Sequence, residues 1–205
     1  FGQNALTKMT NATSNTAFGF NTLKENVSGD YNTAIGSNSQ QNNTGSFNTA
    51  LGRYSMYANT SGAGGTAFGH KAMPAATEAS QNTSIGNFSL EHLVATAADG
   101  NVAIGKSAGS EGTDLSYSVF IGYRAQPKGS GSTRTGTNQI VIGGYEGAAG
   151  NPGFGSNTTK LGSIDTTDTY IMGEISHNTT QRIIDVNNIQ DISIGLALSG
   201  GITPG

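Results

Sequence analysis

The sequence contains no cysteine and no tryptophan, and only 11% of its 205 residues are charged. Without cysteine the chain has no disulfide, no thiolate metal ligand and no cysteine nucleophile. No apolar run approaches the ~20 residues that a membrane-spanning helix needs, so we expect no membrane insertion. The 10 Lys and Arg residues are spread along the chain without an evident basic patch, which argues against nucleic acid as a partner.

Apolar residues are also scarce, at 34%, whereas glycine occurs 31 times. A chain so poor in apolar residues is often disordered, but disorder usually accompanies a high net charge. Here the formal net charge is only -3. The composition therefore favours a regular fold of short strands and turns over a flexible polymer.

One motif, Asn-Thr-Ala-apolar-Gly, recurs along the chain, first at 15–19, 32–36 and 48–52 and then in more degenerate copies. The glycines that close successive copies lie 16 to 21 residues apart. A fixed period of this length is typical of repeat architectures. The recurring Asn and Gly residues are interpreted as structural; they are Asn15, Gly19, Asn32, Gly36, Asn48, Gly52, Gly69, Asn82, Gly86, Asn101, Gly105, Gly122, Gly143 and Gly162.

Each period also carries a second strand signal and a turn signal. Two variable residues, a small residue and often Leu or Met follow the closing Gly, as at 20–23 and 53–56, and a turn such as 26–29 comes next. Asn caps its own turn and Gly accepts a positive φ. Two short strands and two turns in about 17 residues predict an all-β protein, a repetitive parallel β-solenoid of the β-roll or β-helix kind.

Alternation along the motif suggests which side chains face inward. The residue before the closing Gly is always large and apolar, and two positions earlier Thr gives way to Val or Ile in later copies. We therefore expect this face to be interior or half-buried. The small residue between them, Ala in most copies, is then expected to lie close to a neighbouring chain.

These repeats resemble those of phage tail fibres and related bacterial surface proteins, where they precede endosialidase-type chaperone domains. The segments 137–143, 155–162 and 170–173 look like the end of such a repeat region. A more distant likeness is to the heads of trimeric autotransporter adhesins. The resemblance covers residues 1–173. It implies a homotrimeric fibre segment located outside the cell, on a virion tail or a bacterial surface, that attaches to a host glycan or surface protein.

Two regions are expected, a β-solenoid over 1–173, with longer coils from 123, and an apolar tail over 174–205. The tail holds the densest apolar run of the chain. It is interpreted either as a cap on the last coil or as an intertwined oligomerisation segment.

No catalytic constellation is visible, and we expect no enzyme, metal or cofactor. His70, His92 and His177 lack the spacing of a metal site. Asp165 and Asp168 are interpreted as a solvated turn. Paired carboxylates of a glycosidase would have to come from different coils or chains, and that alternative stays open.

Insertions in a solenoid form protruding loops, so receptor binding is expected where the period lengthens, at 126–136 and 144–155. Arg134, Tyr145 and Phe154 are the candidate binding residues, because aromatic rings stack on sugars and Arg donates paired hydrogen bonds. The main alternative is a purely structural spacer whose binding tip lies elsewhere. Ice binding by the Thr ladder and glycan cleavage as a tailspike are weaker alternatives.

Overall fold

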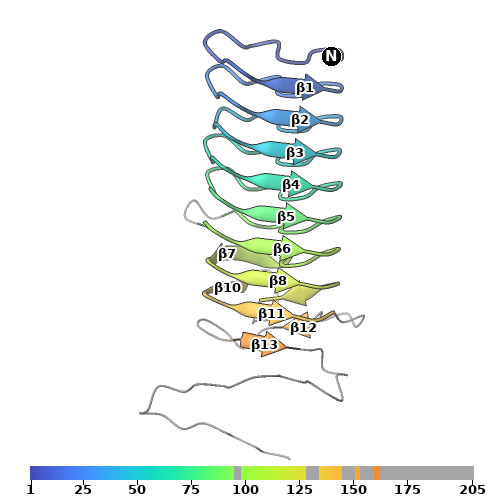
Figure 1. Cartoon of the computed structure of the whole chain (residues 1–205), viewed down its shortest axis with the longest axis vertical. Helices are drawn as coiled ribbons and strands as arrows, with labels where there is room; N and C mark the ends of the chain where they lie inside the picture. Colours follow the sequence, from blue (N-terminus) through green and yellow to red (C-terminus); the bar gives the residue numbers. More distant parts are fainter. Residues whose placement is uncertain (95–97, 128–133, 145–150, 153–158, 162–205) are drawn as a thin grey trace, which may run out of the picture. The chain divides into compact units, whose positions relative to one another are not determined.

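The computed structural model describes residues 1–94, 98–127, 134–144, 151–152 and 159–161. These residues form strands and turns, with no helix among them. The chain winds through successive coils that each add one strand to a long parallel sheet (Figure 1). The predicted all-β parallel solenoid with a spacing of about 17 residues is therefore confirmed.

The main sheet has nine strands, and neighbours pair in parallel without a register shift, so that each motif lies on the next one. Its strands in spatial order are β1 (Thr16–Phe18), β2 (Thr33–Ile35), β3 (Thr49–Leu51), β4 (Thr66–Phe68), β5 (Thr83–Ile85), β6 (Val102–Ile104), β8 (Val119–Ile121), β11 (Ile140–Ile142) and β13 (Thr159–Leu161).

Two smaller parallel pairs occur in the later coils. Strand β7 (Gly112–Ser116) pairs with β10 (Arg134–Thr137), with a register shift between Arg134 and Thr135. Strand β9 (Ala125–Gln126) pairs with β12 (Asn151–Pro152). The second strand expected in every period thus forms only in these later coils, whereas turns take its place in the earlier ones.

The expected orientation of the motif is wrong. The small middle residue faces the interior, with Ala34, Ala50 and Ala67 fully buried, and the flanking Thr and large apolar residues face outward. The physical reason is the narrow cross-section of the coil. Its interior is already filled from the opposite wall by large side chains, so only a small residue fits on the strand. The large buried side chains of that wall are Leu23, Met56, Met73 and Leu90.

Buried asparagines tie successive coils together. The Asn15 side-chain oxygen accepts the Asn32 backbone N–H at 2.8 Å, and the Asn32 oxygen accepts the Asn48 N–H at 2.9 Å. The Asn48 oxygen in turn accepts the Gly65 N–H at 2.8 Å. Because a buried amide must find partners, each Asn fixes the distance between two coils. A second run of this ladder passes through Asn82, Asn101 and Ser118.

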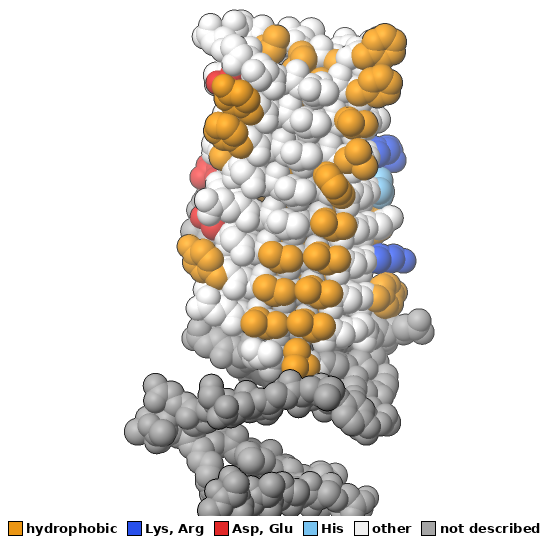
Figure 2. All heavy atoms as spheres, in the orientation of Figure 1, with side chains coloured by type: hydrophobic (Ala, Val, Ile, Leu, Met, Phe, Trp, Pro, Cys, Tyr) orange, Lys and Arg blue, Asp and Glu red, His pale blue; other side chains and the backbone are white. Residues whose placement is uncertain are grey.

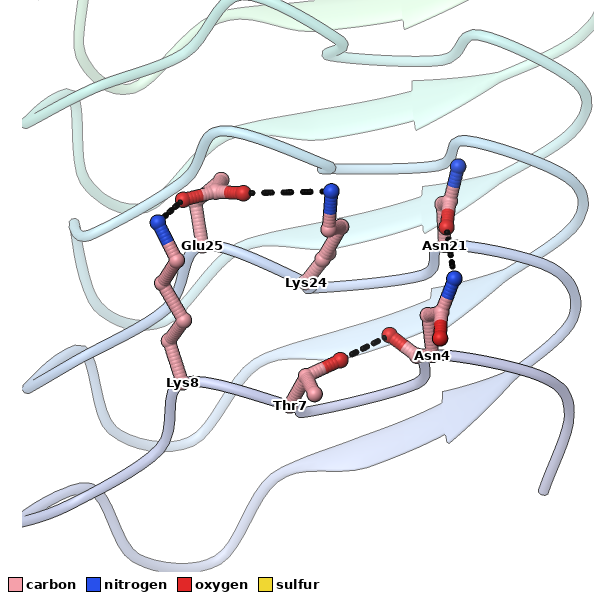
Figure 3. A network of polar contacts seen from close by, with 6 residues as sticks. All are labelled: Asn4, Thr7, Lys8, Asn21, Lys24 and Glu25. Atoms are coloured by element: carbon pink, nitrogen blue, oxygen red, sulfur yellow. Dashed lines mark hydrogen bonds and ion pairs between the residues drawn. The ribbon is translucent and has the colours of Figure 1, made fainter.

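Polar contacts also join coils at the surface of the first turns (Figure 3). The Lys8 ammonium lies 2.5 Å and the Lys24 ammonium 3.6 Å from the Glu25 carboxylate. The hydrogen bond with Lys8 is the main cause that lowers the pKa of Glu25, against a smaller opposing effect of desolvation. The Asn4 amide donates to the Asn21 side-chain oxygen at 3.0 Å.

Candidate binding surface

The outer side of the nine-stranded sheet carries two parallel columns of side chains, which together we name the sheet face. One column begins with Thr16, Thr33 and Thr49, and the other consists of large apolar residues throughout. Figure 2 shows hydrophobic side chains following the sheet along its length. Members of the apolar column are exposed; they are Phe18, Ile35, Leu51, Phe68, Ile104, Ile142 and Leu161, at 37–54%.

The sheet face becomes more apolar along the chain. The Thr column changes to Val102 in β6, Val119 in β8 and Ile140 in β11, beside the continuing apolar column. The lower coils in Figure 2 accordingly show two adjacent hydrophobic columns. A contiguous exposed apolar surface of this kind marks an interaction site in a soluble protein.

The inward column changes in the same region. Phe120 and Val141 replace the small residues of earlier coils and are fully buried. Lys160 takes the corresponding position in β13, and burial lowers its pKa.

One edge of the sheet face is basic, and we define the basic edge as Arg53, Lys71, Lys106 and Arg124. Each of these residues stands one or two positions after a closing Gly, where the strand has ended. Three of them lie against rings: the Arg53 guanidinium is 4.6 Å from the Tyr54 ring centre, Lys71 Nζ is 5.6 Å from that of Phe88, and Lys106 Nζ is 5.7 Å from that of Tyr123. Such contacts hold cations in place.

The opposite edge is acidic, and we define the acidic edge as Asp30, Glu78, Asp99 and Asp114. These residues precede the strands of the main sheet, whereas the basic ones follow them. Figure 2 shows the basic and acidic side chains on opposite sides of the sheet. These columns are not visible along the sequence, because coiling brings residues about 17 positions apart into one column.

Three cations of the basic edge have no carboxylate partner in the described part of the chain. Among the described residues, Arg53, Lys71 and Lys106 form no ion pair with a carboxylate, and the ion pairs of the first turns involve Glu25 instead. Asp30 and Asp99 accept backbone N–H groups, from Thr13 at 2.5 Å and from Ser80 at 2.6 Å. The positive charges of the three cations are thus not neutralised by a carboxylate of the described part of the chain.

The predicted receptor-binding residues are only partly placed. Arg134 begins β10, and its side chain lies outside the described residues, as do Tyr145 and Phe154. The structural repeat residue Gly162 also lies outside them, as does the predicted tail over 174–205.

The histidines of the described part lie apart from one another in the fold. The His70 ring packs edge-on against Phe88, with 5.3 Å between ring centres. His92 Nδ1 lies 2.7 Å from the Ser110 carbonyl oxygen. Within the described ranges, no three His, Asp or Glu side chains gather as a metal site would require.

Across the described part of the chain, no helix has the length and apolarity to span a bilayer. Comparison with protein-family models, with curated proteins and with solved structures found no match for this chain.

Proposed function

We propose that this protein is a structural and adhesive fibre segment, which acts outside the cell as a homotrimer and attaches a virion tail or bacterial surface to a glycan or surface protein. The observation that carries this proposal is the sheet face, an exposed apolar surface that continues from coil to coil. The tail-fibre-like repeats support the same function.

Self-association would remove this surface from water, at roughly 25 cal/mol for each Å² of apolar area buried. Every coil of every copy has the same rise of ~4.8 Å. Two copies that lie side by side therefore match apolar residue to apolar residue along the whole face. A repetitive surface of this kind fits another copy of itself better than it fits a partner without the period.

Stiffness supports the structural part of the proposal. Each strand of the main sheet is bonded to its neighbours in parallel register, and the asparagine ladder fixes the same spacing inside the coil. Such a stack suits a rod that holds binding loops away from a surface. The two longer coils, from Gly122 to Gly143 and from Gly143 to Gly162, are where we place adhesion, with Arg134, Tyr145 and Phe154 as the contact residues.

The sheet face is tested with the Ile104→Thr/Ile121→Thr variant. Threonine already occupies strands of this sheet, so the fold is expected to persist, while association weakens on the order of tenfold or more, because about 1.4 kcal/mol corresponds to each factor of ten. The measurement is the mass in solution over a dilution series. The matched control is Val27→Thr/Val94→Thr, two exposed residues outside the sheet. If both variants dissociated equally on dilution, a role of the sheet face in self-association would be contradicted.

A structural spacer is the alternative within the same fold, and binding by the intact chain separates the two. The adhesive function predicts retention of particular glycans on a glycan array, and loss of that signal in the Tyr145→Ala/Phe154→Ala variant. Both side chains offer a flat apolar ring face on which a sugar can stack. No retention on the array or on surface-protein extracts would favour the spacer.

A further inference from the structure

We propose that copies of this chain associate in parallel and in register, with the basic edge of each copy against the acidic edge of the next. This arrangement rests on the proposed self-association and adds its orientation and its contacts. Its evidence is the charge pattern on either side of the sheet face (Figure 2), which apolar contact alone does not require.

Rotation of copies about an axis parallel to the coil stack keeps all stacks pointing the same way, with each coil at the height of the same coil in the next copy. When the sheet face of each copy is turned toward the axis and viewed from it, the basic edge lies on the same side in every copy and the acidic edge on the other side. Any such rotation, whether two-fold or three-fold, therefore brings a basic edge against an acidic edge. With a three-fold rotation this contact is heterologous and closes into a ring of three copies.

The heights of the charges agree with a ring that has no axial shift. Asp99 and Lys106 flank the same strand, β6, so they meet at one level when neighbouring copies are in register.

The remaining charges are displaced by a single coil. Lys71 follows β4 while Glu78 precedes β5, and Arg53 follows β3 while Asp30 precedes β2. One coil corresponds to ~4.8 Å, which a lysine or arginine side chain spans.

Antiparallel packing of two sheet faces would give the opposite result. The two-fold axis would then lie across the coils, and it would place basic edge on basic edge and acidic edge on acidic edge. It would also set the Thr-rich strands of one copy, such as β1, against the Val- and Ile-rich strands of the other, such as β11. Like charges in contact disfavour a wrong partner arrangement, so the edges select the parallel one.

Disulfide cross-linking tests this arrangement, because the chain has no cysteine of its own. The variant Asp99→Cys/Lys106→Cys places one thiol on each edge at the level of β6. Within one chain the three-residue strand separates them by roughly 10 Å, beyond the ~7 Å Cα reach of a disulfide. We expect oxidation to produce a covalent trimer on a non-reducing gel.

Two controls fix the register and the direction. The Asp30→Cys/Lys106→Cys variant sets the thiols four strands apart in the sheet, or about 19 Å along the stack, and should stay uncross-linked. The single Lys106→Cys variant should also stay monomeric on the gel. Efficient dimers of this single variant would mean that like edges meet, and would overturn the proposal.

Charge reversal supplies a second readout. Lys71→Glu/Lys106→Glu should weaken association about tenfold, given roughly 0.2–1 kcal/mol for each exposed pair in every contact, and the further exchange Glu78→Lys/Asp99→Lys should restore it. A native trimer that neither cross-links nor responds to reversal would contradict this arrangement and leave the proposed function standing. A native monomer would contradict both.

Discussion

Replacing Gly69 by alanine is expected to unfold the coils around it, at a cost of about 4 kcal/mol or more. Gly69 closes the motif of β4 with a φ of +138°, a conformation that a residue with a side chain rarely adopts. A Cβ there would lie 2.5 Å from the carbonyl oxygen of Gly86 in the next coil and 2.7 Å from its carbonyl carbon. Both atoms belong to the backbone, so neither can move aside while the strands stay paired.

The matched control is Gly64→Ala in the same coil. Its φ of +69° is close to that of Tyr31 and Phe47, which occupy the same position in other coils, and its Cβ would meet only Gln81 Cγ, at 3.7 Å. We expect a change below about 1 kcal/mol. Urea unfolding followed by circular dichroism measures both variants, and similar midpoints for the two would contradict the coil-to-coil contact assigned to the closing glycines.

Truncation of Phe120 to alanine should cost about 3–5 kcal/mol, the usual range for a buried Phe. Phe120 is fully buried at the inward position of β8, where the neighbouring strand β6 has Ala103. On the opposite wall the same coil has Gly109, where Met56, Met73 and Leu90 stand in other coils. In this coil the large side chain thus comes from the strand and the small residue from the opposite wall, the reverse of the other coils, so the interior of the coil stays filled.

The exchange predicts a rescue. Gly109→Leu alone should destabilise, because its Cβ would lie 2.8 Å from Leu90 Cδ2 and 3.1 Å from Phe120 Cδ2. In the Phe120→Ala background the same leucine should recover a large part of the loss. Its φ of +61° is tolerable, since Leu23 and Leu90 adopt +48° and +47° at this position. A double-mutant cycle without positive coupling would show that the two walls do not share one core.

The sequence predicts the solenoid well because the period depends on backbone requirements. The closing glycines need a positive φ and close backbone contact, and few other residues satisfy both. The orientation of the motif could not be predicted in the same way. In any strand the side chains of Ala50 and Leu51 point to opposite faces. Only the width of the coil decides that the alanine is the one that points inward.

The candidate surface was only partly predictable for a similar reason. The lengthened coil around Arg134 is visible as an irregular period. The basic and acidic edges are not, because Lys71 and Lys106 become neighbours of one column only after the chain has coiled. The two edges would have been found by aligning the repeats and comparing the charges at equivalent positions of successive coils.

Coverage of the exposed sheet face by further copies of the chain determines the mass of the protein in solution. The most direct measurement is the mass of the intact protein under native conditions, at several concentrations. We expect three times the chain mass of 20.9 kDa, and we expect the Ile104→Thr/Ile121→Thr variant to dissociate more readily. A protein that stays at the mass of one chain at all concentrations would contradict this expectation.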